Sequence, residues 1–361
     1  MKTILFYFNS LQPSGGIERV IVTLANKMCH QYEITILVKD EAKTFYVLDN
    51  RVQLLSLDNE LDFNMNSKVS RFFSAFKSII LNKKALAVFF KNRSFDYYYL
   101  AHPLNVLEFH LSRGVRKKDT IITEHGAPDA YNSIYKKIKS WLYPKAKIYI
   151  VPTTSDTQLY RSMQLPALYL PHFRSDIPYE KANLKDNIAL NIGRFTDVKQ
   201  QITLLRIWNS LVNNKNIKNW KLFLVGSGEL KEEFETYINN NNLQDYVFLL
   251  SPRKDVEYFY KRASLFLLTS KSEGFGMVLL EAISFGLPCV SFDCPSGPRD
   301  IIRNNENGFL IAPNDEIAFE EAVVKFINNP ELKKDMGNKS LLISENWKDS
   351  QLLEGWFNIL N

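Results

Sequence analysis

NIALNIGRFTDVKQQITLLRIW, residues 187–208, decides the fold of this 361-residue chain. It opens with a short, mostly apolar run that ends in a glycine and an arginine. Apolar residues then return at helical spacing, at Ile202, Leu205 and Trp208. A buried strand followed by an amphipathic helix is the repeating unit of a parallel sheet covered by helices. The stretch therefore predicts one β/α unit.

The same alternation recurs on both sides of this unit. Short apolar runs separated by helix-length stretches lie at 3–8, 34–38, 97–101, 120–123, 147–151, 167–170, 222–225, 246–249, 265–269, 288–292 and 308–311. Two successive β/α series predict an α/β chain with two Rossmann-like, doubly wound domains. At roughly 150 residues per domain, the chain length agrees with two.

A polar stretch without periodicity, PHFRSDIPYEKANLKD, separates the two series. We therefore expect an N-terminal domain over 1–172 and a C-terminal domain over 173–345. Residues 346–361 form an expected terminal helix that carries Trp347 and Trp356. Two tryptophans so near a terminus indicate that this helix docks on an apolar surface.

Composition excludes several classes of protein. Hydrophobic residues make up 45% and charged residues 23% of the chain, which is ordinary globular usage and excludes intrinsic disorder, collagen and a disulfide scaffold. The net charge of +6 is uneven: residues 1–172 carry +9 and the remainder carries −3. The two predicted domains thus differ in net charge, because the first is basic and the second is slightly acidic.

The cysteines and the hydropathy pattern indicate the cellular compartment of the protein. Cys29, Cys289 and Cys294 form no C-x-x-C pair, and an odd count favours a reducing compartment. The N-terminal apolar run is too short for a signal peptide, and no run reaches the roughly 18 residues that cross a bilayer. We expect a cytoplasmic protein that contacts membranes only from the surface.

Gly15 and Gly16 follow the first predicted strand and precede an amphipathic helix. Free backbone N–H groups at a helix N-terminus bind phosphate or hydroxyl groups. The alternative is that the two glycines only permit a tight turn. The pair is not a G-x-G-x-x-G sequence, so the dinucleotide fingerprint is absent.

Two cations follow the strand of the opening stretch. Arg194 ends that strand and Lys199 precedes the next helix. Both can point into the crevice at the carboxyl ends of parallel strands, where a diphosphate would attract them. For the Arg-x4-Lys spacing alone, two solvated surface charges are the favoured interpretation.

Two carboxylates follow the strand at 265–269, in SKSEGFGMVLLEAISFG. Glu273 lies in a glycine-containing loop, and the N–H groups of Met277 and Val278 begin a helix that is suited to an anion. Glu281 lies inside that helix among apolar neighbours, where a carboxylate needs a partner. A ribose diol is one candidate partner and a salt bridge to a lysine or arginine is the other.

Together these motifs resemble the GT-B glycosyltransferases, specifically the large retaining family 4. That family shows G-R-L-x-x-x-K, here Gly193 to Lys199, and Glu-x7-Glu, here Glu273 to Glu281. It also shows a Gly-Gly loop after its first strand, and 293–302 resembles a segment of its bacterial members. One departure is that the family's glycine after the clamp lysine is Gln200 here.

The resemblance implies a GT-B fold, with two domains facing across a cleft and the terminal helix packed back on the N-terminal domain. It implies that Arg194 and Lys199 hold the nucleotide diphosphate, that Glu281 takes the ribose, and that Glu273 positions the donor sugar. The backbone of Phe275, Gly276, Met277 and Val278 is implied beside the sugar, Gly15 and Gly16 beside the donor, and Arg253 near the base.

The resemblance also places a histidine near the donor sugar, and His125 in ITEHGA matches it. The chain's other histidines, His30, His102, His110 and His172, are the alternatives. Retaining members are thought to need no protein base near the acceptor, because the leaving phosphate takes the acceptor proton. Arg194 and Lys199 could replace a metal electrostatically, so we expect no metal and no other cofactor.

The expected substrates are a nucleotide sugar, UDP-linked by analogy, and a saccharide or lipid-linked saccharide in capsule, O-antigen or lipooligosaccharide assembly. A nucleotide-sugar epimerase of the same fold is the nearest alternative. A basic nucleic-acid-binding protein is less compatible with the acidic second domain, so we expect no nucleic acid as partner.

The stretch from Lys68 to Arg93 has seven basic residues, no acidic ones and many interleaved aromatic and aliphatic side chains. A basic amphipathic helix is typical of an interfacial membrane segment, and the alternative is a core helix with a solvated edge. From Lys68 to Lys147 the net charge is +11. We expect this region to dock on anionic lipid at the inner face of the cytoplasmic membrane.

Overall fold

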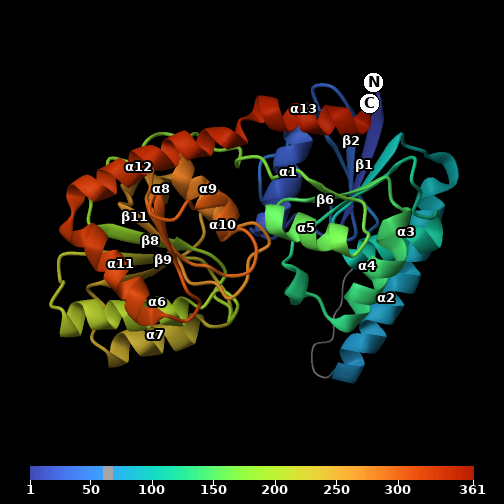
Figure 1. The fold of residues 1–361 in the computed structure, drawn as a ribbon. Helices are drawn as coiled ribbons and strands as arrows, with labels where there is room; N and C mark the ends of the chain where they lie inside the picture. Colours follow the sequence, from blue (N-terminus) through green and yellow to red (C-terminus); the bar gives the residue numbers. More distant parts are fainter. Residues whose placement is uncertain (60–67) are drawn as a thin grey trace. The chain divides into compact units, whose positions relative to one another are not determined.

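The computed structural model describes the backbone of residues 1–59 and 68–361 and the side chains of 1–59 and 77–361. The chain divides into two compact units. Unit 1 contains Met1–Phe173 and Asp349–Asn361, and unit 2 contains Arg174–Lys348. In each unit helices cover a parallel sheet (Figure 1), so the predicted α/β class with two Rossmann-like domains is confirmed.

The sheet of unit 1 is wound in both directions from its first strand. Its strands are β1 (Thr3–Phe8), β2 (Glu33–Val38), β3 (Gln53–Ser56), β4 (Tyr97–Leu100), β5 (Thr120–Thr123), β6 (Ile148–Val151) and β7 (Ala167–Tyr169). Within the described residues they form one seven-stranded sheet of order β3-β2-β1-β4-β5-β6-β7, parallel throughout. The chain reverses its direction of winding between β1 and β4, which is where such sheets bind ligands.

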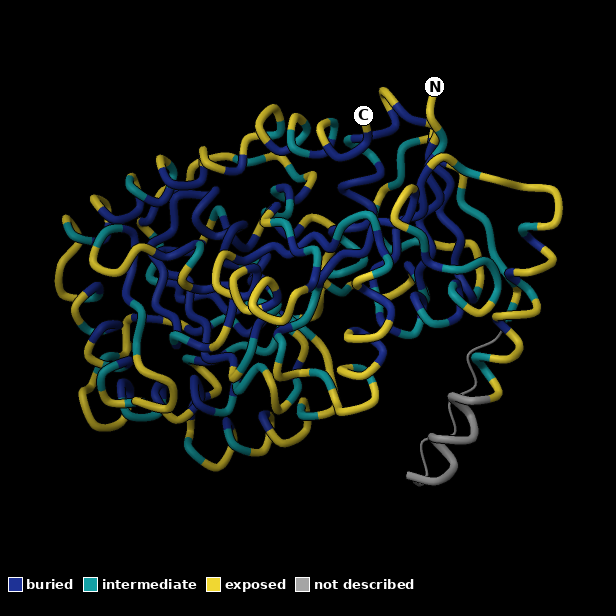
Figure 2. The backbone as a smooth tube through the Cα atoms, turned by 45° about the vertical axis from the view of Figure 1, so that its right-hand side comes forward, coloured by how far each residue is buried: buried dark blue, intermediate teal, exposed yellow. Residues whose placement is uncertain are grey.

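Helices of unit 1 pack on this sheet with their apolar sides inward. They are α1 (Gly16–Met28), α2 (Lys68–Phe89), α3 (Pro103–Ser112), α4 (Ser133–Leu142), α5 (Thr154–Ser162) and α13 (Asp349–Leu360), with short turns η1 (Phe90–Asn92), η2 (Pro128–Ala130) and η3 (Tyr143–Lys145). The strands β1, β2, β4, β5 and β6 are almost entirely buried, whereas the helices alternate buried and exposed residues (Figure 2). This burial pattern explains why the strands have continuous apolar runs.

Unit 2 repeats the winding. Its strands are β8 (Ile188–Ile192), β9 (Lys221–Val225), β10 (Val247–Leu250), β11 (Leu265–Leu268), β12 (Cys289–Phe292) and β13 (Gly308–Ile311). Its helices and turns are α6 (Gln201–Asn209), η4 (Ser210–Asn214), α7 (Lys231–Asn240), α8 (Glu257–Arg262), α9 (Met277–Ser284), α10 (Pro298–Ile301), α11 (Glu316–Asn328), α12 (Pro330–Ser344) and η5 (Glu345–Trp347). In the described part of the unit the order is β10-β9-β8-β11-β12-β13, so the winding reverses between β8 and β11.

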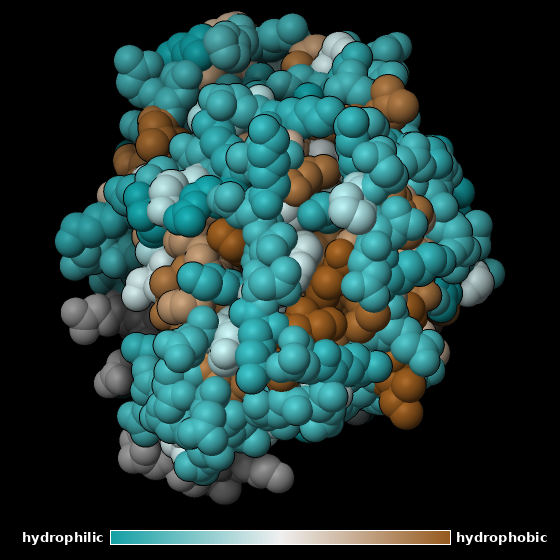
Figure 3. Space-filling view, turned by 90° about the vertical axis from the view of Figure 1, so that its left-hand side faces the viewer, coloured by the Kyte–Doolittle hydropathy of each residue, from teal (hydrophilic) through white to brown (hydrophobic). Residues whose placement is uncertain are grey.

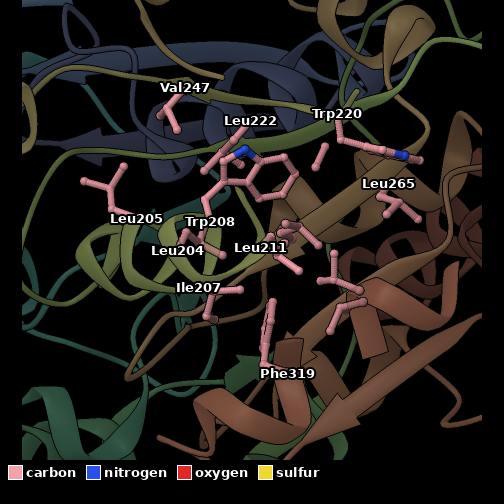
Figure 4. Packing of buried hydrophobic residues seen from close by; sticks show 14 of the residues in the cluster. Leu204, Leu205, Ile207, Trp208, Leu211, Trp220, Leu222, Val247, Leu265 and Phe319 are labelled. Atoms are coloured by element: carbon pink, nitrogen blue, oxygen red, sulfur yellow. The ribbon is translucent and has the colours of Figure 1, made fainter. Parts of the chain in front are cut away.

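The helix predicted from the opening stretch builds the core of unit 2. Figure 4 shows Leu204, Leu205 and Trp208 of α6 among side chains from neighbouring strands and from α11. Trp208 is 1% exposed. Burying such an aromatic side chain stabilises the unit by about 2–3 kcal/mol.

The structure adds two details. The strand β3 was not identified from the sequence, because this edge strand is only half-buried and lacks a continuous apolar run. The expected single helix over 346–361 is interrupted between η5 and α13. Trp347 contacts Phe275 in unit 2, with ring centroids 6.4 Å apart, whereas Trp356 contacts Tyr99 in unit 1 at 6.1 Å.

The terminal helix α13 is fastened to unit 1 by polar contacts at both ends. The Leu360 carbonyl accepts hydrogen bonds from Lys2 Nζ at 2.6 Å and from the Tyr97 hydroxyl at 2.7 Å. At the other end, Asp349 pairs with Lys27 at 2.9 Å. The expectation that this helix packs back on the N-terminal domain is confirmed.

The face of the molecule that Figure 3 shows is mainly hydrophilic. In the view of Figure 3 the hydrophobic side chains are interspersed among hydrophilic ones, as is usual for globular proteins. Among the helices that the structure describes, none combines the length and the apolar character needed to cross a bilayer.

Candidate functional site

The loops after β8 and β11 join two of the predicted site residues. Lys199 Nζ lies 2.7 Å from Glu273 Oε1, and the Ser270 hydroxyl donates to the same oxygen at 2.6 Å. Because β8 and β11 are neighbours, their carboxyl ends meet at the point where the winding reverses. The ion pair therefore occupies the part of unit 2 that is best placed for a ligand.

Arg194 lies beside this pair in the chain but differs in environment. It is exposed, and its side chain has no hydrogen bond or ion pair with any residue that the structure describes. Its backbone carbonyl accepts a hydrogen bond from Gln201 Nε2 at 3.0 Å, which fixes the loop. The guanidinium is thus left available for a phosphate, its best-matched partner.

The N-terminus of α9 supplies backbone donors in the same unit. Gly276 caps the helix with φ 91°, a left-handed conformation that favours glycine, and no side chain caps it. Intrahelical hydrogen bonds begin at the Leu279 N–H, so the amides of Met277 and Val278 precede them. Phe275, which precedes this turn, is buried.

Glu281 has two hydroxyl partners. It is 2% exposed and accepts hydrogen bonds from the Tyr260 hydroxyl at 2.7 Å and from the Ser175 hydroxyl. The environment of this carboxylate therefore includes hydroxyl donors, the chemistry that a ribose offers.

Arg253 is not brought to this group of residues by any described contact. Its guanidinium forms a bidentate pair with Asp255 on the surface, at 2.9 and 2.6 Å. An exposed pair of this kind holds the side chain only weakly.

In unit 1, Gly15 and Gly16 begin α1 without using glycine's special backbone freedom. Gly15 has φ −82°, and Gly16 is the first helical residue. A Cβ on Gly16 would meet nothing within 4 Å, whereas one on Gly15 would clash with Glu18 at 2.2 Å. The tight-turn interpretation is therefore not supported, and the space at Gly16 lets a ligand approach the helix backbone.

His125 follows β5 and is held between hydroxyl groups and a second histidine. Its Nε2 lies 2.8 Å from Thr123 Oγ and 3.3 Å from the Tyr99 hydroxyl. His172 stacks on its ring at 5.1 Å with an angle of 11°. Burial, together with His102, lowers the pKa of His125 to about 3, so its imidazole is neutral at physiological pH.

The alternative histidines differ in position. His102 caps α3, where its Nδ1 accepts from the Leu104 N–H at 3.2 Å, and burial lowers the pKa of His102 to about 4. His30 is exposed beside Arg51, and His110 contacts Trp141. Of the four, His172 is the one that the structure places against His125.

Sequence reasoning missed Glu124, the residue that anchors the His125 loop. Its Oε1 accepts from the backbone N–H groups of His125 at 2.9 Å and Gly126 at 3.1 Å, and from the Tyr131 hydroxyl at 2.6 Å. Its Oε2 accepts from the Tyr160 hydroxyl at 2.9 Å, from Lys139 Nζ and from the Tyr149 hydroxyl.

Burial opposes the charge of Glu124, but Lys139 and the hydroxyl donors outweigh it and hold the pKa of Glu124 below its ordinary value. The carboxylate therefore stays ionised inside unit 1. No signal in the sequence separates this buried pair from two solvated charges.

Among the described residues, Cys29, His30 and Asp49 are close enough to share a metal ion. Arg51, however, pairs with Asp49 at 2.7 Å and contacts both ring nitrogens of His30. A guanidinium in that place disfavours a cation, so we assign no metal to these residues.

A known protein family matches the part of the chain that holds the candidate residues of unit 2. Residues 173–341 match the family model described as "Glycosyl transferases group 1". The matched range contains every candidate residue of unit 2, from Arg194 to Glu281.

Two curated relatives match along their whole length. One, from Campylobacter jejuni, is "GalNAc-alpha-(1->4)-GalNAc-alpha-(1->3)-diNAcBac-PP-undecaprenol alpha-1,4-N-acetyl-D-galactosaminyltransferase", 28% identical over 100% of this chain and 98% of its own. The other is the "Amylovoran biosynthesis glycosyltransferase AmsD" of Erwinia amylovora, 26% identical over 100% of both chains.

The fold also matches solved structures. S. aureus TarM, solved with Fondaparinux, alpha-GlcNAc-glycerol and UDP, superimposes with a TM-score of 0.80 over 100% of both chains at 16% identity. At that identity the match establishes the GT-B fold alone.

Proposed function

We propose that the chain is a retaining hexosyltransferase of family 4 with the GT-B fold. Support comes from the family model that matches residues 173–341 and from the relatives that match the chain along its length. The protein moves a hexose or N-acetylhexosamine from a nucleotide sugar, most simply a UDP-sugar, to a saccharide acceptor. The process that it serves is the assembly of a cell-surface polysaccharide such as capsule, O-antigen or lipooligosaccharide.

The observation that carries the proposal is the grouping at the β8/β11 switch point of unit 2. An ion pair between Lys199 and Glu273, an unpaired guanidinium at Arg194 and the amides that begin α9 all belong to the segment that matches the glycosyltransferase family. Departure of a nucleoside diphosphate builds negative charge on its phosphates. Fixed cations and helix amides aimed at that charge lower the barrier.

Each carboxylate has a distinct role in this proposal. Glu281, which already accepts from two hydroxyl groups, takes the ribose hydroxyls. Glu273, oriented by Lys199 and Ser270, accepts from hydroxyl groups of the transferred sugar. His125 stays neutral, and it therefore serves as a hydrogen-bonding group rather than as a general acid.

No protein base is required near the acceptor in this mechanism. The leaving phosphate oxygen takes the proton of the acceptor hydroxyl on the same face of the sugar as the new glycosidic bond forms and the bond to the phosphate breaks. Retention of the anomeric configuration follows. Proton NMR of the product distinguishes retention from inversion.

The acceptor is proposed to be lipid-linked, and the protein to work on the inner face of the cytoplasmic membrane. Support comes from the Campylobacter jejuni relative, whose name contains an undecaprenol-linked acceptor. The relatives named above are transferases, so they do not favour the nucleotide-sugar epimerase.

We further propose that no metal is needed, because Arg194 and Lys199 supply positive charge to the diphosphate. Activity that is lost in EDTA and restored by Mg²⁺ or Mn²⁺ would contradict this part.

The test of the function is a thermal-shift screen of nucleotide sugars, followed by transfer assays with each donor that binds. A donor at 100 times its Kd stabilises the protein by about 2.7 kcal/mol. Arg194→Glu should abolish the shift, whereas Arg303→Glu, on an exposed residue that pairs with Glu306, is the matched control. A shift retained in Arg194→Glu would mean that the donor binds elsewhere.

A further inference from the structure

Helix α4 of unit 1 presents two chemically different faces. Its inner face consists of the buried residues Ile138, Lys139 and Leu142. Ile134, Lys137 and Trp141 follow one another at i, i+3 and i+7 on the outer face and are exposed. An exposed tryptophan and isoleucine gain nothing from water, so this face requires an explanation.

Trp141 is the centre of the outer face. It is 52% exposed, and its ring is flanked by the His110 ring at 5.2 Å and by Lys145 Nζ at 4.7 Å. Among the residues that the structure describes, it is the one exposed tryptophan, because the other four are at most 5% exposed. An aromatic ring beside cations is typical of side chains at a membrane–water interface.

The surface around α4 is more basic than the sequence indicates. From Lys77 to Lys147, where every side chain is described, thirteen basic residues reach the surface but only two acidic ones, Asp96 and Asp129. The other acidic residues of this range, Glu108, Asp119 and Glu124, are buried. Glu108 and Glu124 are neutralised by the buried Lys39 and Lys139, and Asp119 pairs with Arg116. The remaining exposed lysines and arginines therefore make this surface positive.

We propose that the outer face of α4 (Ile134, Lys136, Lys137 and Trp141) docks on a bilayer that contains anionic lipids. Trp141 and Ile134 enter the headgroup region, and the surrounding lysines and arginines contact the lipid phosphates. The inference rests on the proposed function, since a lipid-linked acceptor lies in such a bilayer.

This assignment changes the expected docking element. The stretch from Lys68 to Arg93 was expected to provide the apolar contact. In the described part of α2, Leu86 and Phe89 are buried in the core of unit 1, whereas Ile80, Leu81 and Val88 are exposed. Its residues Lys68, Arg71, Phe72, Phe73 and Phe76 lie outside the described side chains. In the described part, α4 offers the exposed aromatic ring that α2 lacks.

The position of this face also suits transfer to a membrane-bound acceptor. On the inner face of the same helix, Lys139 pairs with Glu124, whose carboxylate accepts from the His125 N–H. A single helix thus connects the proposed membrane surface with the loop of a candidate site residue.

The experiment measures tryptophan fluorescence of the full-length protein against vesicles whose acyl chains are brominated. Vesicles with phosphatidylglycerol should quench the fluorescence, and vesicles of phosphatidylcholine alone should not. Raising the salt from about 0.1 M to about 1 M shortens the Debye length from about 10 Å to about 3 Å and should release the protein. Trp141→Phe should remove the quenching, because the remaining tryptophans are buried.

Flotation with the same vesicles tests the charges and the apolar contact separately. Lys136→Glu/Lys137→Glu should weaken binding by about thirtyfold or more, since each lysine near an anionic surface contributes roughly fivefold. Ile134→Ser should weaken it too, whereas Ile317→Ser, at a still more exposed isoleucine in unit 2, is the control and should not.

Several outcomes would overturn the proposal: flotation without quenching of Trp141, equal binding to neutral vesicles, or binding of a single-stranded oligonucleotide but not of vesicles by the same lysines. Donor-induced thermal shifts of the wild type separate the two hypotheses. If the wild type binds a donor but does not bind anionic vesicles, only the docking surface is wrong. If no nucleotide sugar shifts the wild type, the proposed function fails instead.

Discussion

Lys199 and Glu273 are 74 residues apart in the chain, yet Nζ and Oε1 lie 2.7 Å apart. The pair connects the loops that follow the two strands at the switch point of unit 2. Each residue alone is consistent with a solvated charge. Together they hold a cation and a carboxylate in a fixed relation, as the binding of a charged, hydroxyl-rich donor requires.

The first prediction concerns this pair. Lys199→Met should lower kcat/KM by about 100-fold or more, because it removes a fixed cation from the position where the diphosphate charge develops. Lys271→Met is the matched control: this lysine lies in the same loop as Glu273 but pairs with Asp197 on the surface. Steady-state kinetics of both variants give the two values of kcat/KM. A similar loss of kcat/KM in both variants would mean that Lys199 has no specific role in the site.

The second prediction concerns the buried ion pair of Glu124 and Lys139, which anchors the His125 loop. Lys139→Met should destabilise the protein by about 3 kcal/mol, because it leaves the ionised Glu124 buried without its cation. The double variant Glu124→Gln/Lys139→Met should recover part of that loss, since no charge is then left unpaired.

Urea unfolding measures these changes. Lys137→Met, two residues earlier on the exposed face of the same helix, is the control and should stay within about 0.5 kcal/mol of the wild type. If the double variant is less stable than both Glu124→Gln and Lys139→Met, the stability lost in Lys139→Met does not come from the unpaired charge of Glu124.

The two-domain fold follows from the sequence because buried parallel strands require continuous apolar runs, and these are visible without any partner. The candidate residues of unit 2 were found for the same reason, since each follows such a run. Glu124 could not be found, because its partners Lys139, Tyr149 and Tyr160 come from other elements. The strand β3 was missed because an edge strand needs only one covered face.

The third prediction concerns Gln200, where the resembled family has glycine. Gln200 adopts φ 49° and ψ 40° at the start of α6, a left-handed conformation that costs a non-glycine residue about 1 kcal/mol or more. Gln200→Gly should therefore raise the free energy of unfolding by up to about 1 kcal/mol, after the added freedom of the unfolded chain is subtracted. Gln200→Ala keeps a Cβ and should not stabilise the protein, so equal effects of the two variants in urea unfolding would rule out relief of backbone strain.

The last prediction concerns the pH dependence of stability. Burial, aided by His102, lowers the pKa of His125 to about 3 in the folded protein, whereas an unfolded histidine titrates near 6.5. Below about pH 6.5 the unfolded chain therefore binds a proton that the folded chain does not. The stabilising contribution is complete above that pH and is lost as the pH falls toward about 3, by up to about 1.4 kcal/mol per pH unit.

Replacing the imidazole should remove this contribution. His125→Gln should flatten the fall in unfolding free energy between about pH 6 and about pH 5, even if it is less stable at neutral pH. His172, stacked on the same ring and with its pKa also lowered by burial, adds to the slope of the wild type, so the variant keeps a residual pH dependence. Urea unfolding at several pH values gives both slopes, and identical slopes would mean that His125 is protonated as readily in the folded protein as in the unfolded chain.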